Sequence, residues 1–138
     1  MKKYHNTYVW FTSLNRSAIE SIESKYDSEV FFKDPFNEIH GVEGVRKLYL
    51  DMFDHLQEPH FIFQEILESD DQVFVVWDFV FKIKGKKLCI HGSSHLKFNQ
   101  KGLIFYHRDY WDVGEELLLK IPLLKIFYGF LKRRFSSL

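Results

Sequence analysis

A run of alternating apolar residues in the second half of the chain limits the folds that it can adopt. From Gln72 to Ile83 one side of an extended strand carries large apolar residues at every position: Val73, Val75, Trp77, Phe79 and Phe81. The segments 60–69, 87–98 and 103–112 are also expected to be extended, and the turn signals Asp70-Asp71, Lys84-Gly85-Lys86 and Asn99–Gly102 separate these strands. Strands longer than ten residues do not stay flat, so we predict a strongly curved antiparallel sheet.

The first sixty residues show helical rather than strand spacing. Residues 8–14 carry an aromatic face, and a short second helix presents Ile19, Ile22 and Tyr26. A short strand at 29–34 follows, ended by Pro35. The spacing of three and four then predicts an amphipathic helix that Pro59 ends, with its apolar face formed by Val45, Leu48, Tyr49, Met52, Phe53 and Leu56. Because helices precede the strands instead of alternating with them, the fold class expected is α+β.

The composition fits one domain with a deep apolar interior. The chain has 138 residues and a mass of 16.7 kDa, the size of a single domain. We expect a core over 8–112 and a helical tail over 113–138. Aromatic residues make up 18% of the chain, and large flat side chains in that number suit a curved sheet around an apolar cavity.

Charge and cysteine content exclude several classes of function. Lys and Arg number 19, as do Asp and Glu, so the overall charge gives no argument for a nucleic-acid partner. The single cysteine, Cys89, has no metal-type spacing around it, and no nucleotide or flavin motif is present, so no metal or cofactor is predicted. Neither a signal peptide nor a spanning segment is apparent, and the cytoplasm is the expected location.

Several short landmarks occur in a recognisable order. They are Leu14-Asn15, Asp34-Pro35, Gly41, Gly85, Ser94–Asn99 and Arg108–Asp112. In this order they resemble the nuclear transport factor 2-like superfamily, in particular its SnoaL-like and ketosteroid-isomerase-like members. The resemblance implies a cone-shaped α+β barrel with a pocket for a small hydrophobic molecule. It also implies a homodimer through the outer sheet face, where the sequence places outward aromatics such as Phe74.

Asp34 is the first candidate catalytic residue. In the steroid-isomerase branch, an Asp before Pro in this strand is the general base, and a carboxylate at the mouth of an apolar cavity suits that role. The alternative is an Asx-type turn before Pro35. The oxyanion partners of that branch do not carry over, because Trp10 stands where the branch has a Tyr and Ser94 where it has a protonated Asp.

Asp109 and His107 are the second pair of candidates. The string from Arg108 to Asp112 resembles the last strand of limonene-epoxide hydrolases, whose mechanism also needs an Arg and a second Asp on the central strand. Here that strand offers Asp78, which alternation turns away from Trp77. SnoaL-type polyketide cyclases use a single pocket Asp as base, and Asp109 can meet that requirement.

The resemblance places His107, Asp109 and Trp111 in the cavity. A His beside an Asp on one strand face can form an acid–base dyad, and the alternative is a structural polar cluster. The predicted catalytic residues are therefore Asp34, His107 and Asp109. The predicted pocket residues are Trp10, Trp77, Phe79, Ser94 and Trp111.

Two classes of function follow from this pattern. One is an acid–base enzyme of the isomerase, cyclase or hydrolase type that acts on a small hydrophobic molecule. The other is a non-catalytic module that binds a lipid-like ligand or a protein partner. The two differ in whether the polar groups meet at one point of the cavity.

The tail is more apolar than a surface helix requires. Its stripe consists of Leu123, Leu124, Phe127, Phe130 and Leu131, and Lys132, Arg133 and Arg134 follow at the end. We expect this helix to cover the open cavity, with the cations favourable at its C-terminus. The alternative is an amphipathic anchor at a membrane surface.

Overall fold

Six strands form one curved sheet in the computed structural model of the chain, which describes residues 3–117, 120 and 122–136. The strands are β1 (Tyr26–Lys33), β2 (Glu38–His40), β3 (Gln57–Ser69), β4 (Gln72–Ile83), β5 (Lys86–Phe98) and β6 (Ile104–Tyr110). Their order across the sheet is β2-β1-β6-β5-β4-β3, and every neighbouring pair is antiparallel except β1 and β6, which run parallel. The curved sheet and the α+β class are therefore confirmed, with one parallel pairing inside the sheet.

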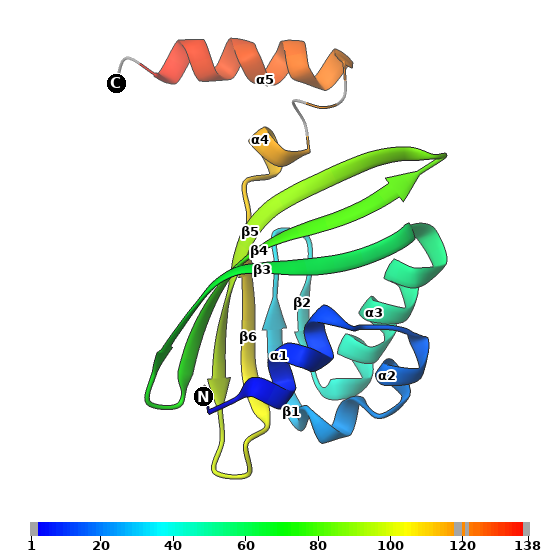
Figure 1. Ribbon diagram of the computed structural model, residues 1–138. Coiled ribbons are helices and arrows are strands. Elements are labelled where there is room, and N and C mark those ends of the chain that lie inside the picture. The colour runs from blue at the N-terminus through cyan, green and yellow to red at the C-terminus, as the bar shows by residue number, and fades with distance from the viewer. Residues whose placement is uncertain (1–2, 118–119, 121, 137–138) are drawn as a thin grey trace.

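The N-terminal helices lie against one face of this sheet (Figure 1). They are α1 (His5–Thr12), α2 (Arg16–Glu20), the 3-10 turn η1 (Ile22–Ser24) and α3 (Val42–His55). The long helix α3 buries Val42, Val45 and Tyr49. The apolar side of β4 buries Val73, Val75, Trp77 and Phe81 against the same core, as the alternation in the sequence predicts.

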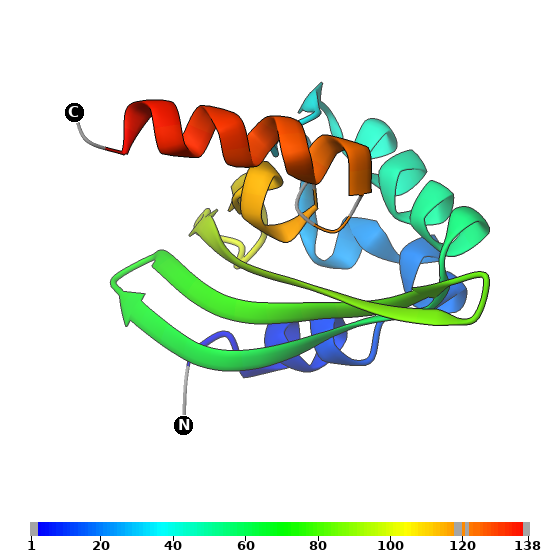
Figure 2. The ribbon, with the colours of Figure 1, turned by 90° about the horizontal axis from the view of Figure 1, so that it is seen from above.

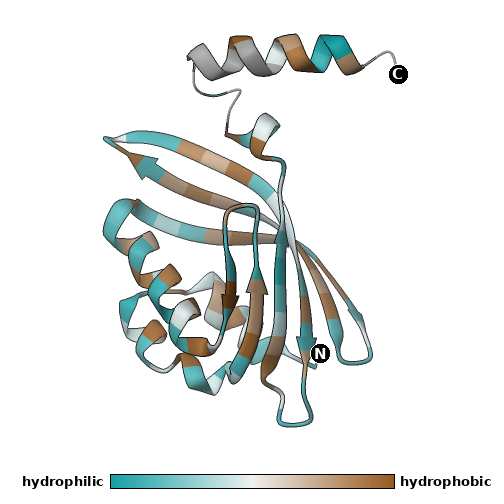
Figure 3. Cartoon of the chain, turned by 180° about the vertical axis from the view of Figure 1, so that it is seen from behind, coloured by the Kyte–Doolittle hydropathy of each residue, from teal (hydrophilic) through white to brown (hydrophobic). Residues whose placement is uncertain are grey.

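The opposite face of the sheet carries the intervening residues. Phe74 is 44% exposed there, in agreement with the predicted direction of its side chain. Asp78 and His91 also lie on this face and are joined by a hydrogen bond. Figure 3 shows the resulting alternation of hydrophilic and hydrophobic residues along the strands.

Several boundaries differ from the prediction, and Tyr26, expected on the second helix, begins β1 instead. Helix α3 ends at His55, and Pro59 lies inside β3 instead of ending the helix. The chain leaves the helix at Leu56, which is already extended, and Glu58 has a positive φ of 51° where the pairing of β3 with β4 shifts register between Gln57 and His60. The short strand β2 carries no periodicity that the sequence could show, and it pairs with β1 through residues 38–40.

The C-terminal segment contains α4 (Val113–Glu116) and α5 (Pro122–Phe135). Figures 1 and 3 place α5 beyond α4, apart from the sheet and the N-terminal helices, and Figure 2 shows it clear of β3 and β4. The prediction that this helix covers the cavity is therefore wrong for its described part, where Phe130 is 57% exposed. The stripe residues Leu123, Leu124 and Phe127 lie outside the described side chains. Among the described residues, no helix is both long and apolar enough to cross a membrane.

Candidate functional site

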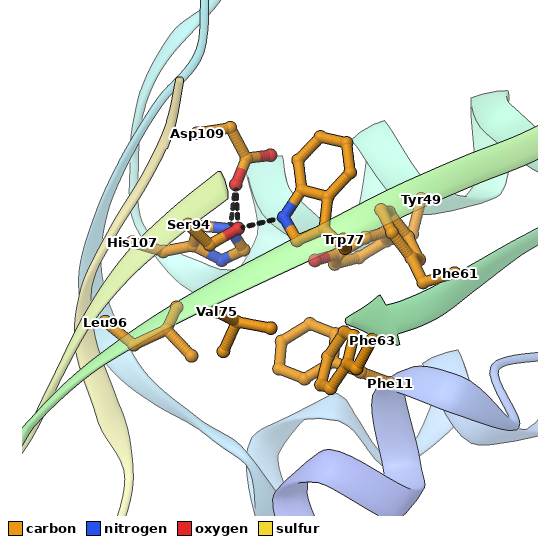
Figure 4. A pocket seen from close by; sticks show the side chains of 10 residues that line it. All are labelled: Phe11, Tyr49, Phe61, Phe63, Val75, Trp77, Ser94, Leu96, His107 and Asp109. Atoms are coloured by element: carbon orange, nitrogen blue, oxygen red, sulfur yellow. Dashed lines mark hydrogen bonds and ion pairs between the residues drawn. The ribbon is translucent and has the colours of Figure 1, made fainter. Parts of the chain in front are cut away.

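Three neighbouring strands bring polar side chains together on the inner face of the sheet. Ser94 on β5 pairs in register with Asp109 on β6 and lies near Trp77 on β4. The indole Nε1–H of Trp77 donates to Ser94 Oγ at 2.8 Å, and the Ser94 hydroxyl donates to Asp109 Oδ1 at 2.5 Å. Figure 4 shows this first arm of a hydrogen-bonded chain that ends on the carboxylate.

A second arm reaches the same carboxylate oxygen from the other side. His107 Nε2 lies 2.7 Å from Asp109 Oδ1, and His107 Nδ1 lies 2.8 Å from the hydroxyl of Tyr26. The Tyr26 hydroxyl is in turn 2.9 Å from that of Tyr49. Helix α3, strand β1 and strand β6 each supply one member, so the arm connects three elements that are distant in sequence.

The donors along both arms have one consistent direction when Asp109 is ionised. Oδ1 then accepts from Ser94 and from His107 Nε2–H, which leaves Nδ1 to accept from Tyr26. The Tyr26 oxygen accepts from Tyr49. Burial raises the pKa of Tyr26 and of Tyr49 well above the ordinary value, so both hydroxyls keep their protons and remain donors near neutral pH.

The second oxygen of Asp109, Oδ2, is not part of either arm. Within the described part of the chain, no hydrogen bond reaches Asp109 Oδ2, and no fully buried side-chain oxygen or nitrogen lacks a partner. Oδ2 therefore has access to open space. The Asp109 side chain as a whole is only 16% exposed, so this access is narrow, and Asp109 lines both the apolar space inside the sheet and the pocket outside it.

The space in front of Asp109, here called the inner cavity, has a volume of about 160 Å³. Its apolar lining includes Phe32, Leu48, Met52, Phe61, Phe79 and Trp111. A narrow extension of about 20 Å³ continues past Trp77 and Tyr49 toward α1. On the other side, an outer pocket of about 450 Å³ meets the inner cavity at Asp34, Asp109 and Trp111. A volume of about 160 Å³ is comparable to that of a small organic molecule.

The predicted site residues divide into those that meet at this point and those that do not. His107, Asp109, Ser94 and Trp77 form the hydrogen-bonded chain, and Phe79 and Trp111 line the inner cavity. Trp10 does not line the inner cavity. It packs in the core, where its Nε1–H donates to the backbone oxygen of Ala18 at 3.3 Å.

Asp34 lies at the rim, with its carboxylate engaged in a turn. Its Oδ1 accepts from the backbone N–H of Phe36 at 2.8 Å and from that of Asn37 at 2.7 Å. This is the Asx-type turn that the sequence offered as the alternative to catalysis. Among the described residues no group of His, Cys, Asp and Glu side chains has the arrangement of a metal site.

Sequence reasoning missed Tyr26 and Tyr49. The sequence pattern predicts both as apolar-face residues of helices; both are buried, and Tyr49 lies on α3, but Tyr26 lies on strand β1. Their hydroxyls meet His107 only because β1 pairs with β6, and no local spacing in the sequence reports that pairing.

The fold is shared with several solved structures at low sequence identity. An NTF2-like protein of unknown function from Burkholderia pseudomallei superposes with a TM-score of 0.73 at 15% identity, covering 88% of this chain and 98% of that one. An LEH-like epoxide hydrolase from M. tuberculosis gives 0.71 at 14% identity, covering 90% and 95%. A putative SnoaL-like polyketide cyclase from Shewanella putrefaciens gives 0.70 at 15% identity, covering 85% and 97%. These likenesses establish the fold alone.

The sequence itself matches a family model. No curated protein matches the chain. The model of the SnoaL-like domain matches residues 9–107, which span α1 through most of β6 and thus include Trp77, Ser94 and His107. The curved sheet, the helices on its inner face and this match lead to one assignment: the chain belongs to the SnoaL-like domain family.

Proposed function

We propose that the protein catalyses proton transfer on a small, predominantly apolar molecule, with Asp109 as the general base. The proposal rests on the difference between the two oxygens of this carboxylate: one is hydrogen-bonded and the other is not. Oδ1 is fixed by Ser94 and His107, whereas Oδ2 has no hydrogen-bond partner among the described residues, and the Asp109 side chain lines the inner cavity. A base must be held in place and still have a free lone pair directed at the substrate.

The surroundings of Asp109 suit the removal of a proton from carbon or from water. The inner cavity is mainly apolar, so a bound molecule is shielded from bulk water and the carboxylate acts at close range. When Asp109 Oδ2 takes a proton, the two donors on Oδ1 keep the side chain in its orientation. The chemistry that fits is an isomerisation or cyclisation through an enolate, or the addition of a deprotonated water.

Tyr49 is the candidate donor to an oxygen of the substrate. Its hydroxyl belongs to the second arm, and its side chain lines the inner cavity together with Asp109. Burial raises the pKa of Tyr49, so its hydroxyl stays protonated. Its one proton is given to Tyr26 in this arrangement, so donation to a carbonyl oxygen that develops negative charge requires the Tyr49 hydroxyl to turn from Tyr26 to the substrate. We assign Asp109 as the catalytic residue and His107 and Ser94 as positioning residues.

Deuterium exchange tests the proposal without knowledge of the natural substrate. A panel of small cyclic ketones, including β-tetralone, is incubated with the protein in D₂O, and deuterium at the α-carbon is followed by NMR. We expect catalysed exchange for ketones that fit the inner cavity, and a loss of roughly 10²–10⁴-fold in Asp109→Asn. Ketone affinity, measured separately by tryptophan fluorescence, should change far less.

The chain offers a matched control for this substitution. Asp78 on the outer sheet face also holds a histidine, His91, at 2.7 Å, yet it lies outside the cavity. Asp78→Asn should leave exchange unchanged. Exchange that persists in Asp109→Asn, or binding without any exchange by the native protein, contradicts catalysis and favours the alternative, a module that binds a hydrophobic ligand.

A further inference from the structure

The charges of this neutral chain are separated along the sequence. Of its 19 Lys and Arg residues, five lie in residues 117–138, whereas none of its 19 Asp and Glu residues does. The C-terminal segment therefore carries a formal charge of +5, and residues 1–116 carry −5. A sequence-wide balance conceals a cationic tail on an acidic body, and the tail has the electrostatic character of a segment that binds an anionic surface.

Helix α5 presents apolar side chains to solvent in the same segment. Ile126 is 71% exposed, Phe130 57% and Phe135 59%. Ile126 and Phe130 are one turn apart, so they lie on the same side of the helix. These three side chains are among the most exposed large hydrophobic residues of the described chain. Large hydrophobic side chains that are exposed close to one another are typical of a surface that binds a membrane or another molecule.

The cations stand next to these apolar groups. Lys132, Arg133 and Arg134 form the last turn of α5, and all three are exposed. The helix has 14 residues, which corresponds to a length of about 21 Å. That is too short to span a bilayer, and it suits a helix that lies in the plane of the headgroups.

We propose that α5 docks the protein on the surface of an anionic lipid bilayer. Ile126 and Phe130, which share one side of the helix, enter the boundary between headgroups and acyl chains, and the basic last turn pairs with lipid phosphates. Because α5 lies beyond α4 and apart from the sheet, docking requires no rearrangement of the core (Figures 1 and 2). Charge complementarity favours an anionic lipid surface over the pairing of two tails from two copies of the chain, since two +5 tails repel each other.

Co-sedimentation of the full chain with vesicles tests this docking. One set of vesicles contains phosphatidylcholine alone, and the other contains phosphatidylcholine mixed with phosphatidylglycerol. We expect partitioning onto the anionic vesicles only, with a partition coefficient that falls as salt is raised. Absence of binding to the anionic vesicles at low salt overturns the proposal.

Substitutions separate the electrostatic contribution from the apolar one. Replacing Lys132, Arg133 and Arg134 together by Gln should lower the partition coefficient by about a hundredfold, since each cation near an anionic surface contributes roughly one kcal/mol. Ile126→Ser combined with Phe130→Ser should lower it by at least about tenfold. Both sets of residues are exposed, so the melting temperature should stay unchanged and report intact folding.

A hairpin variant with the same change of charge provides the control. Lys84, Lys86 and Lys87 are exposed at the β4–β5 turn, and their joint replacement by Gln should leave vesicle binding near that of the native chain. An equal loss in this control shows a nonspecific charge effect and contradicts the assignment to α5. Sedimentation velocity tests whether a second copy of the chain binds α5 instead. If the native chain is a dimer that Phe130→Ser dissociates, and it does not bind vesicles, then the second copy is the partner and the proposal is wrong.

Discussion

The substitution Tyr26→Phe removes a single oxygen atom, yet we expect it to destabilise the protein markedly. The hydroxyl is buried and connects His107 Nδ1 at 2.8 Å to the Tyr49 hydroxyl at 2.9 Å. Tyr26→Phe keeps the ring in its place in the core but leaves both neighbours without this partner. Each buried polar group that loses its hydrogen bond costs about 1–3 kcal/mol.

The expected magnitude follows from the burial of those two neighbours. His107 is 3% exposed and is held in place by its strand, so water does not reach its Nδ1 readily. Tyr49 borders the inner cavity, where its hydroxyl can find another partner at a lower cost. We therefore expect a loss of about 2–3 kcal/mol in the free energy of unfolding, mostly from His107. For a domain of this size, that lowers the melting temperature by about 6–12 °C.

Urea denaturation followed by circular dichroism measures the loss. Tyr49→Phe removes the terminal donor and should cost about 1 kcal/mol. In the double variant the two losses should not add, because one shared hydrogen bond is counted in both single variants. Tyr106→Phe on the outer sheet face is the control. A loss in Tyr26→Phe no larger than in that control, or full additivity with Tyr49→Phe, refutes the hydrogen-bonded arm.

Other substitutions have consequences that the structure specifies. A methyl group at Gly92 would approach the Trp77 ring within 2.7 Å, so Gly92→Ala should cost about 1–3 kcal/mol in a denaturation experiment and should alter tryptophan fluorescence. Asp34→Ala removes the acceptor of two backbone amides and should cost about 1–2 kcal/mol by the same measurement. Burial lowers the pKa of His95 below its ordinary value of 6.5, so the unfolded chain binds more protons at this residue than the folded chain does. The free energy of unfolding should therefore fall as the pH drops below about 6.5. This fall, measured by urea denaturation at several pH values, should be less steep in His95→Gln.

Alternation along the strands was sufficient to predict which side chains share a face. It separated Trp77 from Asp78, and the family resemblance then placed Asp109 on the inner face, as the register of β4, β5 and β6 has them. The period of two is a direct geometric property of an extended chain, and it holds wherever one face of a sheet is buried. The face of the sheet that carries the candidate site could therefore be predicted from the sequence.

Other features depend on contacts between distant segments. Trp10 has the aromatic character of a pocket residue, but whether a helix places a ring in a cavity or in the core depends on how that helix packs. The position of α5 is a similar case, because an apolar stripe predicts burial without naming the surface that buries it. The sequence shows the basic residues of α5, but it does not predict that this helix lies apart from the sheet and the N-terminal helices.

Two His–Asp pairs in this chain illustrate why residue type alone does not define a catalytic group. Asp78 and Asp109 each lie 2.7 Å from a histidine, and each pair lies within the same sheet. In the outer pair the His91 side chain is 59% exposed, so water screens the interaction and competes for every lone pair. In the inner pair His107 is nearly buried and receives a further hydrogen bond from Tyr26. The position of the inner carboxylate is thus set by the protein, and its remaining oxygen has no hydrogen-bond partner among the described residues. What distinguishes Asp109 is therefore the chain of buried donors behind it, which the fold assembles from β1, α3 and three neighbouring strands.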